Sequence, residues 1–76
     1  MALVTKMSRI TKSRNAVHGE VDCTYLIFED AGQTYLQLDT HGSTARSIPG
    51  KVSQSLQINE ASAKQLRQIL RQAFGL

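Results

Sequence analysis

The stretch VDCTYLIFEDAGQTYLQLDT, residues 21–40, has the pattern of two β-strands joined by a tight turn. In residues 34–40 apolar side chains fall on one face and polar ones on the other, because side chains alternate along a strand. Residues 21–29 are apolar on both faces toward their middle, which predicts a central or interface strand rather than an exposed edge. Gly32, in the turn EDAGQ, can take the positive φ that a hairpin turn requires.

The C-terminal residues 59–74, NEASAKQLRQILRQAF, predict an amphipathic helix. Asn59 is suited to the N-cap, Glu60 to the first turn and Gly75 to the position where the helix ends. Apolar residues recur at steps of three and four, as expected for one face of a helix: Ala63, Leu66, Ile69, Leu70, Ala73 and Phe74.

Two further segments alternate with a period of two residues. Residues 52–58, VSQSLQI, predict a strand after a loop of about eleven residues, HGSTARSIPGK. Residues 3–10, LVTKMSRI, predict a first strand with a weaker pattern. The order strand, strand, strand, strand, helix predicts an α+β fold in which the helix packs on one face of a four-stranded antiparallel sheet.

The two faces of this sheet differ in the sequence. The face expected under the helix is apolar and consists of Leu36, Leu38, Leu56 and Ile58. The opposite face is polar but hardly charged, and it consists of Tyr35, Gln37, Ser53, Ser55 and Gln57. A face of this kind can form hydrogen bonds with a partner without strong charge repulsion.

The length of 76 residues predicts a single domain spanning residues 1–76. A core of this size contributes only a few kcal/mol of net stability, and the single Cys23 allows no internal disulfide. We therefore expect a homodimer. The free thiol, the absence of a secretory signal and the absence of a run of about 20 apolar residues predict a cytoplasmic protein without membrane contact.

The charges are divided along the chain, whose net charge is +3. Residues 1–19 and 46–76 are basic, and residues 20–45 carry five acids and no Lys or Arg. Two basic ends favour contact with a polyanion on one side of the molecule. Solvated charge that serves only solubility is the alternative.

No enzymatic chemistry is predicted. Gly50-Lys51 lacks the first glycine and the hydroxyl of a phosphate-binding loop, and it precedes a strand instead of a helix. His18, His41, Cys23 and Asp39 have no metal-ligand spacing, so neither a metal nor another cofactor is expected. Cys23 is expected to be buried in a strand, where a thiol behaves as a small apolar group.

Single-stranded nucleic acid is the polyanion that fits the chain best. Basic side chains in strands and loops can follow a phosphate backbone, and aromatic side chains can stack on bases. Tyr35 is the best stacking candidate, because Phe74 and Phe28 are expected in the core. The predicted contacts are Lys6, Arg9, Lys12, Arg14, Tyr35, Arg46, Lys51, Ser53 and Ser55.

The stretches TYLIFEDAGQTYLQLD (24–39) and IPGKVSQSLQINEASAKQLRQIL (48–70) resemble the positive-cofactor-four family of transcriptional coactivators, which bind single-stranded DNA. The shared outline is a hairpin, a long loop ending in a Pro-Gly-basic turn, a strand entered through small residues and a capped helix. The resemblance implies a curved four-stranded sheet, a dimer formed by helices and adjacent strands, and DNA on the strand surface. Arg46 and Lys51 take the positions of the family's basic loop residues.

This chain also departs from the family's pattern. The strand entry Lys-Gly-Ile-Ser-Leu becomes KVSQSL at residues 51–56, and an aromatic residue usual in the helix is missing. The stretch 37–58 is similar to that of a group of small bacterial proteins, which implies a bacterial origin. Two hypotheses result: a non-catalytic homodimeric module that binds single-stranded DNA or RNA, and a protein-interaction or self-assembly module that uses the polar sheet face.

Overall fold

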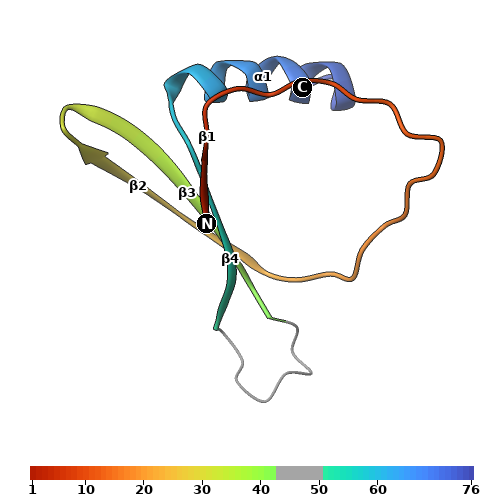
Figure 1. Ribbon diagram of the computed structural model, residues 1–76, viewed down its shortest axis with the longest axis horizontal. Coiled ribbons are helices and arrows are strands. Elements are labelled where there is room, and N and C mark those ends of the chain that lie inside the picture. The colour runs from red at the N-terminus through yellow and green to blue at the C-terminus, as the bar shows by residue number, and fades with distance from the viewer. Residues whose placement is uncertain (43–50) are drawn as a thin grey trace.

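The computed structural model describes residues 1–42 and 51–76 and consists of one sheet and one helix (Figure 1). The α+β class with four strands followed by a helix is confirmed. The strands lie in the spatial order β1-β4-β3-β2. The elements are β1 (Ala2–Val4), β2 (Cys23–Asp30), β3 (Gln33–His41), β4 (Val52–Ile58) and α1 (Glu60–Phe74). The predicted Pro49-Gly50 loop end lies outside the described residues.

The predicted hairpin of β2 and β3 is confirmed. The two strands pair antiparallel from Cys23 opposite Thr40 to Asp30 opposite Gln33. The turn consists of Ala31 and Gly32, whose φ angles are 51° and 78°. Positive φ at both turn residues matches the twist of the flanking strands. β4 then pairs antiparallel with β3, and its bounds are those expected from the alternation.

The expectation of a fully antiparallel sheet is wrong for β1, which pairs parallel with β4. The strand is also shorter than the predicted 3–10, since it ends at Val4. β1, β4 and β2 therefore run in the same direction. A chain that leaves the end of β1 must return to the opposite end of the sheet to begin β2, and parallel strands require such long connections.

Residues 5–22 make this return and are called the arm. No helix or strand forms in the arm, and all of its residues are exposed except the half-buried Met7. Figure 1 shows that the arm passes beside α1 and then swings away from the sheet before β2 begins. This path carries the chain from one edge strand to the other, which explains the length of the arm.

The predicted caps of α1 are confirmed. Asn59 Oδ1 accepts a hydrogen bond from the Ser62 N–H at 3.0 Å, and Ser62 Oγ accepts one from the Asn59 N–H at 3.1 Å. At the other end Gly75 takes the left-handed conformation and donates its N–H to Arg71 O at 2.8 Å. Glu60 lies in the first turn, as expected for the positive end of the helix dipole. No helix among the described residues is long and apolar enough to cross a membrane.

The helix covers the apolar sheet face incompletely. Ala63, Leu66 and Leu70 face Leu36 and Ile58 across an open hollow of about 580 Å³. Among the described residues, Ile58 is the one apolar side chain that is fully buried, with 3% of its surface exposed.

Several side chains expected inside are exposed instead. Cys23 is exposed and Phe74 is 72% exposed, so their expected burial is wrong for this chain. β2 is an edge strand, so the central position that the sequence allowed for it is wrong, and Tyr25 and Ile27 are 70% and 67% exposed. The physical reason is that α1 packs over β3 and β4 and leaves the β2 side of the apolar face uncovered.

Candidate functional site

The sheet has a second face that α1 does not cover, and it is called the polar sheet face. Strand register places Leu26, Gln37, Gln57 and Leu3 side by side across the four strands of this face. The neighbouring rows add Thr24, Asp39 and Ser55 on one side and Phe28 with Tyr35 on the other. Of the residues predicted for nucleic-acid contact, Tyr35 and Ser55 lie on this face.

Four side chains of the polar sheet face form one hydrogen-bonded chain, called the polar row: Gln57, Gln37, Asp39 and Ser55. Gln57 Nε2 donates to Gln37 Oε1 at 2.9 Å, and Gln37 Nε2 donates to both Asp39 oxygens at 3.0 and 3.2 Å. Ser55 Oγ donates to Asp39 Oδ1 at 2.5 Å. The row links β3 to β4, and Asp39 receives hydrogen bonds from both sides.

Asp39 is the acidic centre of the polar row, with 9% of its surface exposed. The hydrogen bonds from Ser55 and Gln37 hold the pKa of this carboxyl below its ordinary value, and the nearby His41 acts in the same direction. Burial opposes this effect, since it disfavours the charged form. Asp39 is therefore ionised at neutral pH and can only accept hydrogen bonds.

Two aromatic side chains, Phe28 and Tyr35, lie on the β2–β3 part of the polar sheet face. The rings of Phe28 and Tyr35 stack across the hairpin, with centroids 5.5 Å apart and planes inclined by 27°. Leu26 lies in the next row along β2 and is 43% exposed. Thr24 Oγ1 and His41 Nε2 form a further hydrogen bond of 2.9 Å at the other end of the hairpin.

The predicted basic contacts are spread over two regions. Lys6, Arg9, Lys12 and Arg14 lie on the exposed arm, outside the strands that carry Tyr35 and Ser55. Lys51 directly precedes β4 and is exposed, and its carbonyl accepts the Gly42 N–H at 3.2 Å. Ser53 lies at a register shift between β3 and β4, where it has no paired residue. Arg46 lies outside the described residues.

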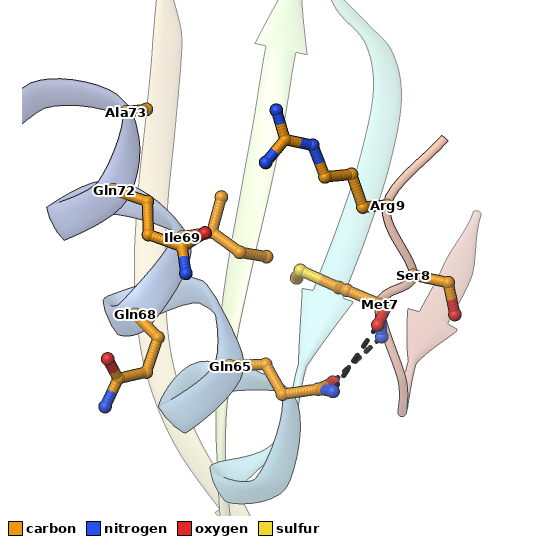
Figure 2. Close-up of a pocket in the computed structure, with 8 residues that line it drawn as sticks. All are labelled: Met7, Ser8, Arg9, Gln65, Gln68, Ile69, Gln72 and Ala73. Atoms are coloured by element: carbon orange, nitrogen blue, oxygen red, sulfur yellow. Dashed lines mark hydrogen bonds between the residues drawn. The ribbon is translucent and has the colours of Figure 1, made fainter. Parts of the chain in front are cut away.

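The arm is attached to α1 at Met7 (Figure 2). Gln65 Oε1 accepts the Met7 N–H at 2.8 Å, and Gln65 Nε2 donates to Met7 O at 3.4 Å. Beyond this contact the arm and the helix enclose a hollow of about 530 Å³, whose lining includes Arg9, Gln68 and Ile69. The basic start of the arm is thus held beside the helix.

The sequence predicted part of the polar sheet face, namely Tyr35, Gln37, Ser55 and Gln57, but it missed the charged Asp39 on this face and the bonds between these side chains. Alternation placed Gln37 with Tyr35, and Gln57 with Ser55. The pairing of Gln37 with Gln57 and of Asp39 with Ser55 depends on the register of β3 and β4, which the intervening loop hides. Asp39 was assigned no role, because its position opposite Ser55 follows only from that register.

Among the described residues, no group of three or more His, Cys, Asp or Glu side chains is placed to hold a metal ion. No family model, curated protein or solved structure matches the chain.

Proposed function

We propose that the protein is a non-catalytic homodimeric module that binds single-stranded nucleic acid along the polar sheet face. The stacked pair of Phe28 and Tyr35 beside the polar row carries this proposal. Unpaired bases expose ring faces and hydrogen-bonding edges, and proteins bind them by stacking and by hydrogen bonds to those edges. The polar sheet face offers both kinds of contact in adjacent rows.

One basic residue precedes a strand of this face, and four more lie on the arm, whose start is attached to α1 on the other side of the sheet. Lys51 directly precedes β4, the strand that carries Ser55 and Gln57. The arm adds Lys6, Arg9, Lys12 and Arg14, and residues 1–19 contain no acid. Such charges attract a phosphate backbone without regard to base sequence.

The large exposed area of the single chain supports the homodimer. The chain exposes 6856 Å², whereas a compact monomer of 8.4 kDa exposes about 4,600 Å². Its radius of gyration is 14.7 Å, compared with about 11.4 Å for a compact chain of this length. This excess of about 2,200 Å² includes the exposed arm as well as uncovered apolar side chains of the sheet and the helix.

The uncovered apolar side chains indicate where the second copy lies. Tyr25 and Ile27 point to the same sheet face as Leu36, beside the part that α1 covers. Ile69 and Phe74 of α1 are exposed as well. A twofold axis would place the helix of each chain against the β2 side of its partner, so that both apolar surfaces are covered.

Fluorescence anisotropy with a labelled oligo-dT tests nucleic-acid binding. Binding is expected at about 50 mM salt and should weaken steeply by about 200 mM, because bound phosphates release counterions. Lys51→Glu should weaken binding several-fold. Lys64→Glu, an equal charge change at a helix residue, serves as the control. Absence of binding at the lower salt would refute the proposal.

The alternative function is a protein-interaction or self-assembly module, and the exposed edge of β2 favours it. Tyr25, Leu26 and Ile27 are exposed on an edge strand that contains no proline or lysine. Such edges pair with strands of other chains. Failure of oligonucleotide binding combined with concentration-dependent growth beyond a dimer in light scattering would favour this alternative.

A further inference from the structure

The polar row has a fixed direction of hydrogen bonding that starts at Asp39. An ionised carboxylate has no proton to donate, so Gln37 must turn its Nε2 toward it. The Oε1 of Gln37 then faces Gln57, which must in turn present its own Nε2. Both amides are thereby held in one orientation.

This orientation determines which atoms the row presents to a ligand. The Ser55 hydroxyl donates its one proton to Asp39, so its oxygen can only accept a hydrogen bond from a ligand. Gln57 Oε1 accepts no hydrogen bond from the described residues. Gln57 Nε2 has one proton left after its bond to Gln37. The β4 end of the row therefore offers two acceptors and one donor.

Ser55 and Gln57 line a shallow hollow that also includes Met1, Ala2 and Leu3. Its volume is about 220 Å³, below the range of roughly 300–1,000 Å³ usual for small-molecule pockets. The apolar side chains of Met1 and Leu3 are exposed at its border. A single flat ring system with polar edges fits such a place better than a larger ligand.

Nucleobases differ in how many donors they present on the Watson–Crick edge. Guanine presents two donor groups, the N1–H and the N2 amine, beside the acceptor O6. Adenine and cytosine present one amine, and thymine and uracil present one N–H between two carbonyls. We infer that the hollow at Ser55 and Gln57 binds one unpaired guanine, with its two donors on Ser55 Oγ and Gln57 Oε1 and its O6 on Gln57 Nε2.

This inference rests on the proposed function and adds base preference to it. Asp39 is a positioning residue in this site, because it acts on the base only through the orientation of Gln37, Gln57 and Ser55. A carboxamide at this position could donate as well as accept, and the row would no longer have a single direction. The measurable consequence is a change in preference between bases.

Competition among oligonucleotides that differ at one nucleotide tests the inference. A 15-nucleotide oligo-dT is compared with versions that carry a central guanine, adenine, cytosine or hypoxanthine. The guanine oligonucleotide should bind the protein about tenfold more tightly than oligo-dT, the size of one good base contact. Hypoxanthine lacks the N2 amine and should lose most of this gain. Equal affinities for guanine and thymine would overturn the inference.

Variants of the polar row test which of its residues cause the preference for guanine. Gln57→Ala should bring the ratio of guanine to thymine affinity close to one, and Asp39→Asn should lower it several-fold. Gln54→Ala, in the same strand but opposite Thr40 on the other sheet face, should keep the wild-type ratio. Circular dichroism confirms that each variant is folded. A wild-type ratio in folded Gln57→Ala would overturn the assignment.

The same experiment separates this inference from the proposed function. If oligo-dT binds and the central guanine does not increase the affinity, nucleic-acid binding is supported and the guanine site is refuted. If no oligonucleotide binds at low salt, both fall. If guanine improves binding and the gain requires Gln57, both are supported.

Discussion

Asp39 accepts the hydrogen bonds that hold the polar row in one arrangement. Its carboxylate accepts hydrogen bonds from both neighbours in the polar row, and its burial leaves little water to replace them. Removal of one partner from a buried polar group costs more than the pair contributes, since the remaining group stays desolvated. Asp39 therefore couples the stability of the sheet to the arrangement of its polar surface.

The stability contributed by Asp39 should depend on pH. Its pKa is lowered in the folded chain by Ser55 and Gln37, so its contribution is fully present above the ordinary pKa of about 3.9. That contribution is lost as the pH falls through the lower folded-state value. The urea midpoint of the wild type should exceed that of Asp39→Asn at pH 7, and the difference should shrink between about pH 5 and pH 2.

Urea titrations at several pH values measure this difference. Asp30→Asn provides the reference, because Asp30 is exposed at the hairpin end and lies apart from the polar row. A difference between wild type and Asp39→Asn that stays constant down to pH 2 would show that the hydrogen-bonded carboxylate contributes no acid-sensitive stability.

Among the elements, the β2–β3 turn places an alanine in a backbone conformation that alanine disfavours. Ala31 has a φ of 51°, and left-handed backbone costs an alanine roughly 1 kcal/mol. Asn-Gly is the preferred pair for such turns, so Ala31→Asn should raise the free energy of unfolding by about 1 kcal/mol. A melting-temperature increase of about 4–8 °C is expected for a domain of this size.

Calorimetry or thermal circular dichroism checks this prediction. Ala16→Asn is the matched control, because Ala16 is an exposed arm residue and Ala31 is the non-glycine residue with positive φ among those described. Equal melting temperatures for Ala31→Asn and the wild type would mean that the turn relaxes into another conformation.

The arm depends on one side chain for its attachment to α1. Gln65 forms both hydrogen bonds to the Met7 backbone, so Gln65→Ala should release the start of the arm. Trypsin should then cleave after Lys6 and Arg9 several-fold faster, because proteases require locally unfolded chain. Gln68→Ala is the control, since Gln68 lines the same hollow without a hydrogen bond to Met7. Cleavage at the wild-type rate would show that other contacts hold the arm.

Elements formed by local interactions were predictable from the sequence. The hairpin, β4, α1 and both helix caps depend on alternation, helical periodicity and capping residues within a few positions. The direction of β1 was not predictable, because it depends on the path of the arm around the sheet. The polar row required a register that no local pattern specifies.

At the scale of the whole molecule, the sequence did not predict which apolar side chains the single chain leaves exposed. Cys23, Tyr25, Ile27 and Phe74 have the apolar character of interior residues, and the single chain leaves them exposed. An apolar pattern has the same appearance whether the covering surface belongs to the same chain or to a second copy. The mismatch between pattern and exposure is thus itself an argument for self-association.

The homodimer should depend on the β2 side of the apolar face. Ile27 lies there beside Leu36, whereas the adjacent Leu26 lies on the polar sheet face beside Gln37. Burial of an isoleucine side chain contributes about 2 kcal/mol, and each dimer would bury two copies. Ile27→Ser should therefore weaken dimerisation at least about a hundredfold, and Leu26→Ser, which removes a similar apolar volume, should leave it nearly unchanged.

Sedimentation equilibrium over a range of micromolar concentrations distinguishes the outcomes. The wild type and Leu26→Ser should sediment at twice the chain mass of 8.4 kDa, and Ile27→Ser at the chain mass itself. Equal weakening by both substitutions would place the interface at the edge of β2 instead of on its apolar face, because an edge contact involves the side chains of both faces. A wild-type monomer would contradict the homodimer, and the exposed apolar face would then require a different protein to cover it.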